Sequence, residues 1–136
     1  MSSARLYDCL ILGGGPAGLS VAQGLCRVHR TCALFSDSEF RNDGIHAIHN
    51  ILTRDGTHPA EFRKIAREQI SRYHTADFID TKITHVVNMT RDGKTAFEVS
   101  DSKGQKWRGR TLVFATGCKD IFPAIEGYKE NWPHNM

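Results

Sequence analysis

The chain has 136 residues, 40% of them hydrophobic, and a formal net charge of +3. This length and composition are typical of a single globular domain that can bury a core. Lys and Arg form no basic run, and only about six apolar residues precede the first glycine cluster, too few for a signal or membrane-spanning segment. A nucleic-acid partner and a membrane location are therefore not expected, whereas a cytoplasmic location is.

The four cysteines show neither C-x-x-C nor zinc-type spacing; they are Cys9, Cys26, Cys32 and Cys118. In a cytoplasmic protein we expect four reduced thiols, with Cys9 and Cys32 inside buried strands. Cys118 follows a glycine at the end of a predicted strand, where cofactors approach folds of this kind. We expect it to be a structural thiol, and a chemical role is the alternative.

A glycine-rich turn follows the first predicted strand, which is the apolar run from Tyr7 to Leu12. Its glycines have G-x-G-x-x-G spacing, and Pro16 favours the first turn of a helix. In this pattern the glycines permit a tight turn, close approach of a pyrophosphate, and close packing of helix on strand, while the helix N-terminus attracts phosphate. The predicted phosphate-binding residues are Gly13, Gly14, Gly15, Pro16, Ala17 and Gly18.

A second buried strand is predicted from Thr31 to Phe35, after an apolar helical face between Gly18 and His29. Strand, helix and strand together form a β-α-β unit, the arrangement that binds dinucleotides. Such folds usually place an acidic residue after the second strand, where it binds a ribose hydroxyl. Here Ser36 occupies that position and Asp37 follows it. Either Asp37 takes the role after a small shift, or Ser36 makes a neutral hydrogen bond.

The connection from Phe40 to Gly56 is long for a compact domain and is therefore expected to be functional. It contains Arg41, His46, His49 and Asn50. The two histidines lack a third ligand at suitable spacing, so no metal site is expected. Polar residues of this kind fit a loop that packs along a bound cofactor.

The second half of the chain predicts one helix and further strands. The helix begins near Pro59 and carries an apolar stripe to Tyr73, and short strands follow at 76–79, 83–89, 96–100 and 105–108. Turn signals at 91–94 and 101–104 indicate an antiparallel meander. A buried parallel strand at 111–115 then ends at Thr116 and Gly117. We expect an α/β fold, in which a parallel sheet with helices carries a β-meander.

Several of these stretches occur together in a fixed order. They are the glycine turn, Arg41-Asn42, the segment 46–50, the segment 52–56 before Pro59-Ala-Glu-Phe62, the meander, and Ala115-Thr-Gly117. In this combination the chain resembles the thioredoxin-reductase-like flavoproteins among the class-II pyridine nucleotide-disulfide oxidoreductases. It is most similar to the fungal branch that includes gliotoxin-type dithiol oxidases of secondary-metabolite clusters. The resemblance covers essentially the whole chain.

The resemblance implies a Rossmann-like domain that binds FAD in an extended pose. It places Gly13 to Ala17 at the pyrophosphate and Ser36 to Arg41 along the adenosine ribose. It places His49 or Asn50 towards the flavin. The backbone of Val86 would meet the adenine, and Ala115, Thr116 and Gly117 would pass near the cofactor. The candidates for proton transfer or thiol chemistry are His46, His49 and Cys118. For each of them we expect a structural role rather than a chemical one.

The end of the chain departs from the family pattern. The resemblance implies that residues 1–118 form the N-terminal part of the FAD-binding domain and that 119–136 lead towards an NADPH domain, which is absent here. In the family a redox-active C-x-x-C follows, and the chain returns to complete the FAD domain. This sequence stops at Met136, before the expected cysteine pair. Thiol–disulfide exchange needs such a pair near the flavin.

Three functions remain open at this point. The chain is a shortened FAD-binding oxidoreductase of fungal secondary metabolism, or a stand-alone flavoenzyme that oxidises a small-molecule intermediate or dithiol without a cysteine pair. Alternatively, it is a catalytically inactive FAD-binding module. Such a module would associate with a second copy, a complementary chain or a full-length relative through an exposed sheet edge.

Overall fold

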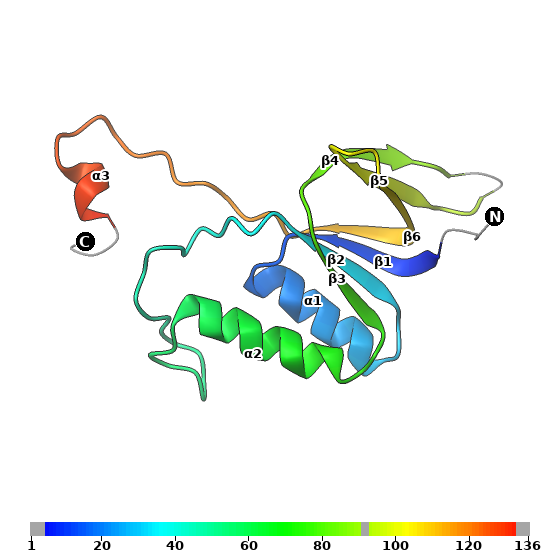
Figure 1. Ribbon diagram of the computed structural model, residues 1–136, viewed down its shortest axis with the longest axis horizontal. Helices are drawn as coiled ribbons and strands as arrows, with labels where there is room; N and C mark the ends of the chain where they lie inside the picture. The colour runs from blue at the N-terminus through cyan, green and yellow to red at the C-terminus, as the bar shows by residue number, and fades with distance from the viewer. Residues whose placement is uncertain (1–4, 91–92, 133–136) are drawn as a thin grey trace.

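In the computed structural model, which describes residues 5–90 and 93–132, the strands form one mixed sheet in the order β3-β2-β1-β6-β5-β4 (Figure 1). The strands are β1 (Leu6–Leu12), β2 (Cys32–Ser36), β3 (Ala76–Asp80), β4 (Ile83–Asn88), β5 (Phe97–Asp101) and β6 (Lys106–Phe114). The helices are α1 (Pro16–Arg27), α2 (Pro59–Ser71) and the short α3 (Tyr128–Asn131). The predicted α/β class is confirmed, and so is the order of its elements from β1 to β5.

The parallel half of the sheet is built around β1, which lies between β2 and β6 and is parallel to both. Strand β3 extends this half beyond β2, also in parallel. Leu10 and Ile11 of β1 are completely buried, because both faces of the strand are covered. This explains why the segment from Cys9 to Leu12 of β1 is a continuous apolar run without polar alternation. The carboxyl ends of β1, β2 and β6 consequently meet at one edge of the sheet.

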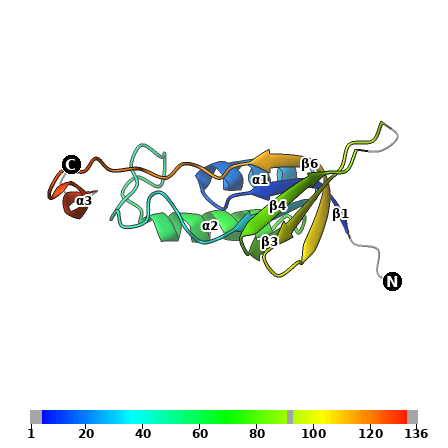
Figure 2. The same cartoon turned by 90° about the horizontal axis from the view of Figure 1, so that it is seen from above.

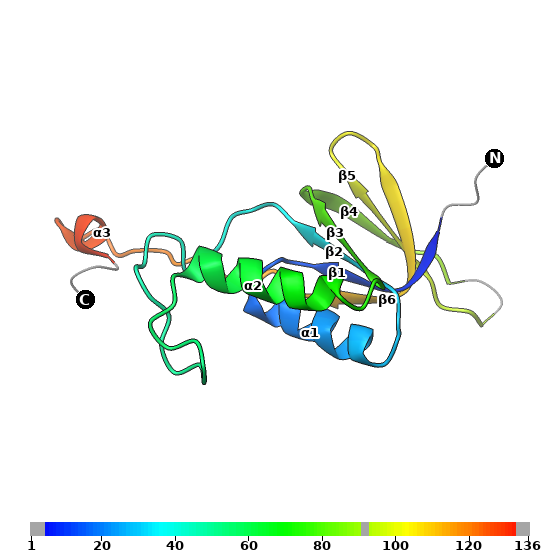
Figure 3. The same ribbon diagram turned by 60° about the horizontal axis from the view of Figure 1, so that its bottom comes forward.

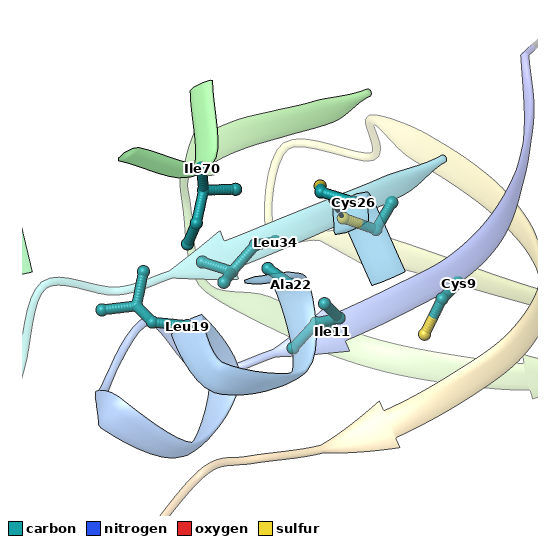
Figure 4. Close-up of a cluster of buried hydrophobic side chains, with 8 residues drawn as sticks. Cys9, Ile11, Leu19, Ala22, Cys26, Leu34 and Ile70 are labelled. Carbon is teal, nitrogen blue, oxygen red and sulfur yellow. Dashed lines mark hydrogen bonds between the residues drawn. The ribbon is translucent and has the colours of Figure 1, made fainter. Parts of the chain in front are cut away.

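Helices α1 and α2 cover one face of this parallel half (Figure 3). Apolar side chains from both helices and from the strands beneath them form a core, shown in Figure 4. Its buried members are Cys9, Ile11, Leu19, Ala22, Cys26, Cys32, Leu34 and Ile70. The apolar stripe predicted on the second helix therefore packs against the sheet, with Ile70 as its buried member.

A second core lies where the meander packs against the parallel strands. Its buried members are Tyr7, Leu10, Leu12, Ala33, Phe35 and Val99, with Ile83 and Trp107 packed against them. The rings of Phe35 and Trp107 meet edge to face, with their centroids 5.0 Å apart. Residues of β1 thus belong to both cores, so the strand that leads into the glycine turn is packed on both of its faces.

The sequence-based division of residues 105–115 into two strands is wrong. Strand β6 is continuous from Lys106 to Phe114; it pairs antiparallel with β5 through its first residues and parallel with β1 along most of its length. Gly109 pairs with Phe97 on one side and with Tyr7 on the other. A Cβ at Gly109 would lie 2.5 Å from Cγ of Leu10, so glycine leaves room for the Leu10 side chain beside β6.

Beyond β6 the chain leaves the sheet as an extended arm that ends at α3 (Figures 1 and 2). Phe122 contacts Tyr128 and Trp132 within this arm, with ring centroids 6.0 and 5.8 Å apart. The segment 119–136 lies in this arm up to residue 132, and its last four residues lie outside the described part of the chain. Its role as a link to a further domain stays a prediction. Residues 91 and 92 of the predicted turn at 91–94 also lie outside the described part. Within the residues described, no helix is long and apolar enough to cross a bilayer.

Candidate functional site

Three glycines, in the turn between β1 and α1 and in the first turn of α1, occupy positions where a side chain would not fit. Gly13 has a φ of +122°, and a Cβ there would overlap the carbonyl oxygen of Ala115. A Cβ on Gly18 would overlap the carbonyl oxygen of Gly13, so the helix packs tightly on the strand end. A Cβ on Gly14 would lie 2.6 Å from Oγ of Ser36. The sequence motif therefore folds as the compact turn that its spacing predicts.

Gly15 differs from the other glycines of the turn because its missing side chain would meet open space. No atom lies within 4 Å of a Cβ built at this position. Gly15 is also the N-cap of α1, and no side chain caps this helix, although α2 is capped by His58, whose Nδ1 accepts the N–H of Ala60 at 3.2 Å. The N-terminus of α1 thus faces open space with uncapped N–H groups, which is the arrangement that binds a phosphate.

Ser36 ends β2 directly beside the turn and is only 5% exposed. Its Oγ accepts the backbone N–H of Ser38 at 3.2 Å, which leaves the hydroxyl hydrogen for donation. Asp37 is exposed, and its Oδ1 accepts the backbone N–H of Glu39 at 3.2 Å. The residue that adjoins the glycine turn is therefore a neutral serine, and Asp37 forms the local turn that follows it.

The end of β6 adjoins the turn from the other side. The backbone N–H of Ala115 donates to the carbonyl oxygen of Leu12 at 2.7 Å, and Ala115 then borders Gly13. Gly117 has a φ of +66°, and both it and Thr116 are exposed. The predicted Ala115-Thr-Gly117 segment thus begins against the glycine turn. Cys118, which follows it, is exposed and free.

Arg41 joins the long loop to the arm. Its Nε and Nη2 donate to Oδ2 and Oδ1 of Asp120 at 3.0 and 2.9 Å. This two-pronged hydrogen bond holds the pKa of the Asp120 carboxyl below its usual value and raises the pKa of the Arg41 guanidinium. The predicted contact of Arg41 with the adenosine ribose stays a prediction. Asp120 has no motif signal in the sequence, because only the folded chain brings it to the loop.

His49 and Asn50 lie at the start of a small turn that is held by Asp55. The backbone N–H of Asn50 donates to Oδ1 of Asp55 at 2.8 Å, and Nδ1 of His49 lies 3.4 Å from the same oxygen. The hydrogen bond from Asn50, helped by His49, lowers the pKa of the Asp55 carboxyl. Asn50 adopts a φ of +64°, which asparagine tolerates better than most residues. The structure thus orients the predicted flavin-side residues through a carboxylate that the sequence did not single out.

His46 lies in the long loop, and Val86 lies in the meander. His46 is exposed within the long loop. Val86 is on the outermost strand β4, paired with Val99 and separated from β1 by β5 and β6. Their proposed roles remain predictions. In the described part of the chain no group of three or more His, Cys, Asp or Glu side chains is placed to hold a metal ion.

A cavity of about 550 Å³ opens beside the glycine turn. One wall is formed by the turn and the end of β2, and the other by one face of α2. Its lining residues are Gly14, Ser36, Ser38, Phe40, Ala60, Arg63, Lys64, Arg67, Glu68, Ser71 and Asp80. The α2 wall was not predicted as part of the site, because its residues read as the charged, solvent-facing side of an amphipathic helix.

Three of the four thiols lie in the core and not at this site. Cys9, Cys26 and Cys32 are buried, and the sulfur atoms of Cys26 and Cys32 are 4.0 Å apart. Burial raises the pKa of the Cys9 and Cys32 thiols, and Cys26 adds to the effect at Cys32. These thiols therefore favour the protonated, unreactive form. The expectation of structural cysteines in buried strands is confirmed for Cys9 and Cys32.

Comparison with known proteins gives this geometry a context. The family model described as pyridine nucleotide-disulphide oxidoreductase matches residues 7–136. The chain is 40% identical over 136 residues to the thioredoxin reductase aclD of Aspergillus oryzae and 39% identical over 133 residues to the thioredoxin reductase tcpT of Claviceps purpurea. These matches cover 98% and 97% of this chain, but 42% and 41% of the two relatives.

Solved structures agree with the sequence matches. The crystal structure of HlmI superposes with a TM-score of 0.89 at 30% identity, over 96% of this chain and 41% of that one. The putative thioredoxin reductase TrxB from Bacillus anthracis superposes with a TM-score of 0.83 at 28% identity, over 91% and 40% of the two chains. The chain thus spans about two fifths of the length of the proteins it matches.

Proposed function

Because the chain belongs to the pyridine nucleotide-disulphide oxidoreductase family, we propose that it is an FAD-binding oxidoreductase whose cofactor pyrophosphate lies on the glycine turn. The observation that carries this proposal is the open space in front of Gly15, where the uncapped N-terminus of α1 ends. A dinucleotide needs this combination, since its pyrophosphate must approach the backbone and be met by N–H groups. The residues present therefore fit FAD, as membership of the family implies.

We assign the parts of the cofactor by position along the fold. The pyrophosphate lies against residues 13–18. The adenosine ribose lies towards Ser36, whose hydroxyl can donate a hydrogen bond to it. The flavin end lies towards the turn held by Asp55, with His49 and Asn50, and Ala115 to Gly117 line the path of the cofactor. The backbone of Val86 is assigned to the adenine on the family resemblance alone.

Bound FAD would supply the redox chemistry by accepting two electrons from the substrate. The chain's own residues then bind and orient the cofactor, and His49, paired with Asp55, is placed to hold or move a proton at its Nε2. We propose that the substrate is a small molecule or dithiol of fungal secondary metabolism, by resemblance to the gliotoxin-type oxidases. Oxidation of a dithiol forms a disulfide and releases two electrons and two protons, which balances the reduction of FAD.

A second candidate function is that of an FAD-binding module without catalysis of its own. It is favoured by the buried position of three cysteines and by the edge strand β4, whose valines are exposed. In this case the chain would associate with a second copy or with a longer relative. The two functions share the FAD site and differ in whether a reductant can deliver electrons to it.

A matched pair of glycine variants tests the FAD site. Gly15→Leu places a side chain in the pyrophosphate position, and its φ of −76° is acceptable for leucine. Gly24→Leu places the same side chain on the same helix, also into open space but away from the turn. FAD binding is measured by flavin fluorescence quenching, and folding by thermal melting. We expect Gly15→Leu to weaken FAD binding at least about tenfold without lowering the melting temperature, and Gly24→Leu to bind FAD normally.

Wild-type protein that gains no flavin on incubation with FAD contradicts both functions. If FAD binds, anaerobic addition of the dithiol dithiothreitol distinguishes them. Bleaching of the bound flavin faster than of free FAD supports the oxidoreductase, and equal rates support the module.

A further inference from the structure

The turn at 40–43, which follows β2, forms part of the wall of the nucleotide site. Its first residue, Phe40, lines the cavity beside the glycine turn, as do Gly14 and Ser36. The resemblance to the family places the adenosine ribose along the segment 36–41. A wall made of loop residues binds a ligand well only if the loop is already held in the binding conformation, because ordering a loop on binding costs free energy.

The turn is closed within itself by Asp43. The backbone N–H of Asp43 donates to the carbonyl oxygen of Phe40 at 3.1 Å, and the backbone N–H of Phe40 donates to Oδ2 of Asp43 at 3.0 Å. These bonds fix the shape of the turn but not its place on the domain. Because loop segments are more mobile than the elements that they connect, the turn needs a contact with a helix or strand to hold it at one position.

Arg63 supplies that contact from the first half of α2. Its Nη1 donates to Oδ1 of Asn42 at 3.0 Å, and its Nη2 donates to Oδ1 of Asp43 at 3.2 Å. Its guanidinium also lies 3.6 Å from the centroid of the Phe40 ring. One side chain therefore binds three of the four residues of the turn, through two hydrogen-bond acceptors and one aromatic face.

The burial of Arg63 makes this contact a firm one. Its side chain is only 12% exposed, so water competes little for its hydrogen bonds. A rigid, planar guanidinium can donate two N–H groups to neighbouring acceptors while it stacks on a ring, a combination that a lysine ammonium does not reproduce. Because α2 packs against the sheet through the buried Ile70, Arg63 holds the turn at a fixed place relative to the glycine turn.

We infer that Arg63 is a positioning residue of the nucleotide site, which holds the turn 40–43 as a preformed wall on the adenosine side. The inference rests on the proposed FAD site and names a residue that the glycine motif does not include. Arg63 also lines the cavity, but two of its N–H groups are engaged by the turn. Without Arg63, any ligand that carries the adenosine diphosphate half would have to order the turn as it binds.

The first test measures affinity for FAD by flavin fluorescence and affinity for 5′-ADP by its displacement of FAD. We expect Arg63→Gln to weaken the binding of both ligands by about tenfold, because both share the adenosine half. Arg63→Lys is expected to weaken both by only about threefold, because lysine keeps a cation over the Phe40 ring but not both hydrogen bonds. The absorption spectrum of the bound flavin should be the same in wild type and variants, since the flavin end is not altered.

Arg5 provides the matched control. Its guanidinium lies 4.8 Å from the centroid of the Tyr7 ring, and its Nη1 lies 2.6 Å from Oδ2 of Asp77. These contacts are at the opposite end of β1 from the glycine turn. Arg5→Gln removes the same charge, with one aromatic and one carboxylate contact, and is expected to leave both affinities within about twofold of wild type. Thermal melting shows that each variant is folded, and if Arg63→Gln does not fold, the same comparison is made with Arg63→Lys.

Proteolysis reports directly on the turn. Arg41 is exposed within the turn 40–43, so trypsin cleaves after it when the turn is released. Without ligand, Arg63→Gln is expected to speed this cleavage by at least about fivefold, and Arg5→Gln to leave it at the wild-type rate. Saturating FAD should slow the cleavage in wild type, because ligand binding and the ordered turn stabilise each other. Mass spectrometry identifies the cut.

Affinities within about twofold of wild type in folded Arg63→Gln overturn this inference and leave the proposed function intact. The same holds for an unchanged rate of cleavage after Arg41, and for equal weakening by Arg5→Gln. Loss of FAD affinity without loss of 5′-ADP affinity also overturns the inference, because the effect then belongs to the flavin end. Failure of 5′-ADP to displace FAD from wild type overturns it as well, since the adenosine half then contributes no binding. Wild type that binds neither FAD nor 5′-ADP overturns the proposed function and this inference together.

Discussion

Gly18 and Gly24 lie on the same helix, but a methyl group has opposite consequences at the two positions. Gly18 packs its Cα against the carbonyl of Gly13, and any Cβ there overlaps that oxygen. Gly24 is exposed and has nothing within reach of a Cβ. The G-x-G-x-x-G spacing includes Gly18 but not Gly24. The contact of Gly18 with the carbonyl oxygen of Gly13 explains why glycine is required only at position 18.

Alanine at these two positions provides the first prediction. Gly18→Ala is expected to lower the free energy of unfolding by about 1–3 kcal/mol, because the overlap with Gly13 forces α1 away from β1. Gly24→Ala is expected to raise it by about 0.5–1 kcal/mol, because alanine restricts the unfolded chain and favours helix. Chemical denaturation measures both. Equal changes in the two variants would contradict the close packing of the turn.

Ser36 shows how far single residues of the site could be predicted. Its position after the second strand follows from counting residues beyond the glycines, and the structure places it against Gly14. The opposite wall of the site could not be found in this way. Arg63 and Lys64 read as the polar side of a helix, and only the placement of α2 beside β2 and β3 turns that side towards Ser36. A local sequence pattern predicts that a helix has a polar face, but it does not predict which residues elsewhere in the chain lie opposite that face.

At the level of elements, one buried carboxylate joins β5 to β6. The side chain of Glu98 is 9% exposed, and it accepts hydrogen bonds from Nζ of Lys106 at 2.7 Å and from Nε of Arg108 at 2.8 Å. The hydrogen bond from Lys106, followed by that from Arg108, lowers the pKa of the Glu98 carboxyl below its ordinary 4.5. The ionised form is therefore favoured in the folded state.

The second prediction concerns the pH dependence of this contact. The lowered pKa means that the stabilisation is fully present above about pH 4.5 and is lost as the pH falls through the folded-state value. Glu98→Gln is expected to cost about 1–3 kcal/mol of unfolding free energy at pH 7, and the difference from wild type is expected to shrink below pH 4.5. Urea denaturation across this pH range measures it. The control Glu39→Gln, at an exposed position, should change little at any pH.

Strand β6 is continuous in the structure, although the sequence predicted two strands in this segment. The segment Arg108-Gly-Arg110 has a glycine between two charges, which resembles a turn. Strand pairing in fact continues through Arg108 and Gly109, and the glycine is needed because the Leu10 side chain packs against it. A glycine that permits a turn and a glycine that makes room for a side chain of the neighbouring strand look the same in the sequence. The distinction depends on a residue about a hundred positions away.

At the level of the whole molecule, the arm that follows β6 is held to the domain by Arg41 and Asp120. Their two hydrogen bonds join residues that are 79 positions apart in the sequence. The third prediction is that Arg41→Gln releases the arm and accelerates trypsin cleavage after the exposed Lys119. Arg41→Lys should give an intermediate rate, because lysine keeps the charge but not the paired geometry. Mass spectrometry of timed digests follows the cut.

The exposed Arg72 at the end of α2 supplies the control for this experiment. Arg72→Gln removes the same charge and should leave cleavage after Lys119 at the wild-type rate. If Arg41→Gln leaves that rate unchanged as well, the ion pair does not hold the arm in solution.

The two edges of the sheet differ in how they are protected. Asp80 in the edge strand β3 pairs with Arg67 of α2, which brings the helix beside that edge. Strand β4 exposes Val86 and Val87 at the other edge. An open edge with exposed valines favours pairing with another strand, and in two copies related by a two-fold axis β4 would pair with itself. This arrangement is the proposed route by which the chain would associate.

The fourth prediction tests that route by placing a charge on the edge. Val87 is 52% exposed, so Val87→Lys should leave the fold intact but set like charges against each other across a β4–β4 contact. We expect wild-type protein to dimerise with rising concentration in sedimentation analysis, and Val87→Lys to weaken the dimer about tenfold. Leu52→Lys is the control, because Leu52 is 92% exposed but lies in the loop before α2. Equal weakening by both variants would indicate general loss of apolar surface, and monomeric wild type at high concentration would exclude pairing through β4.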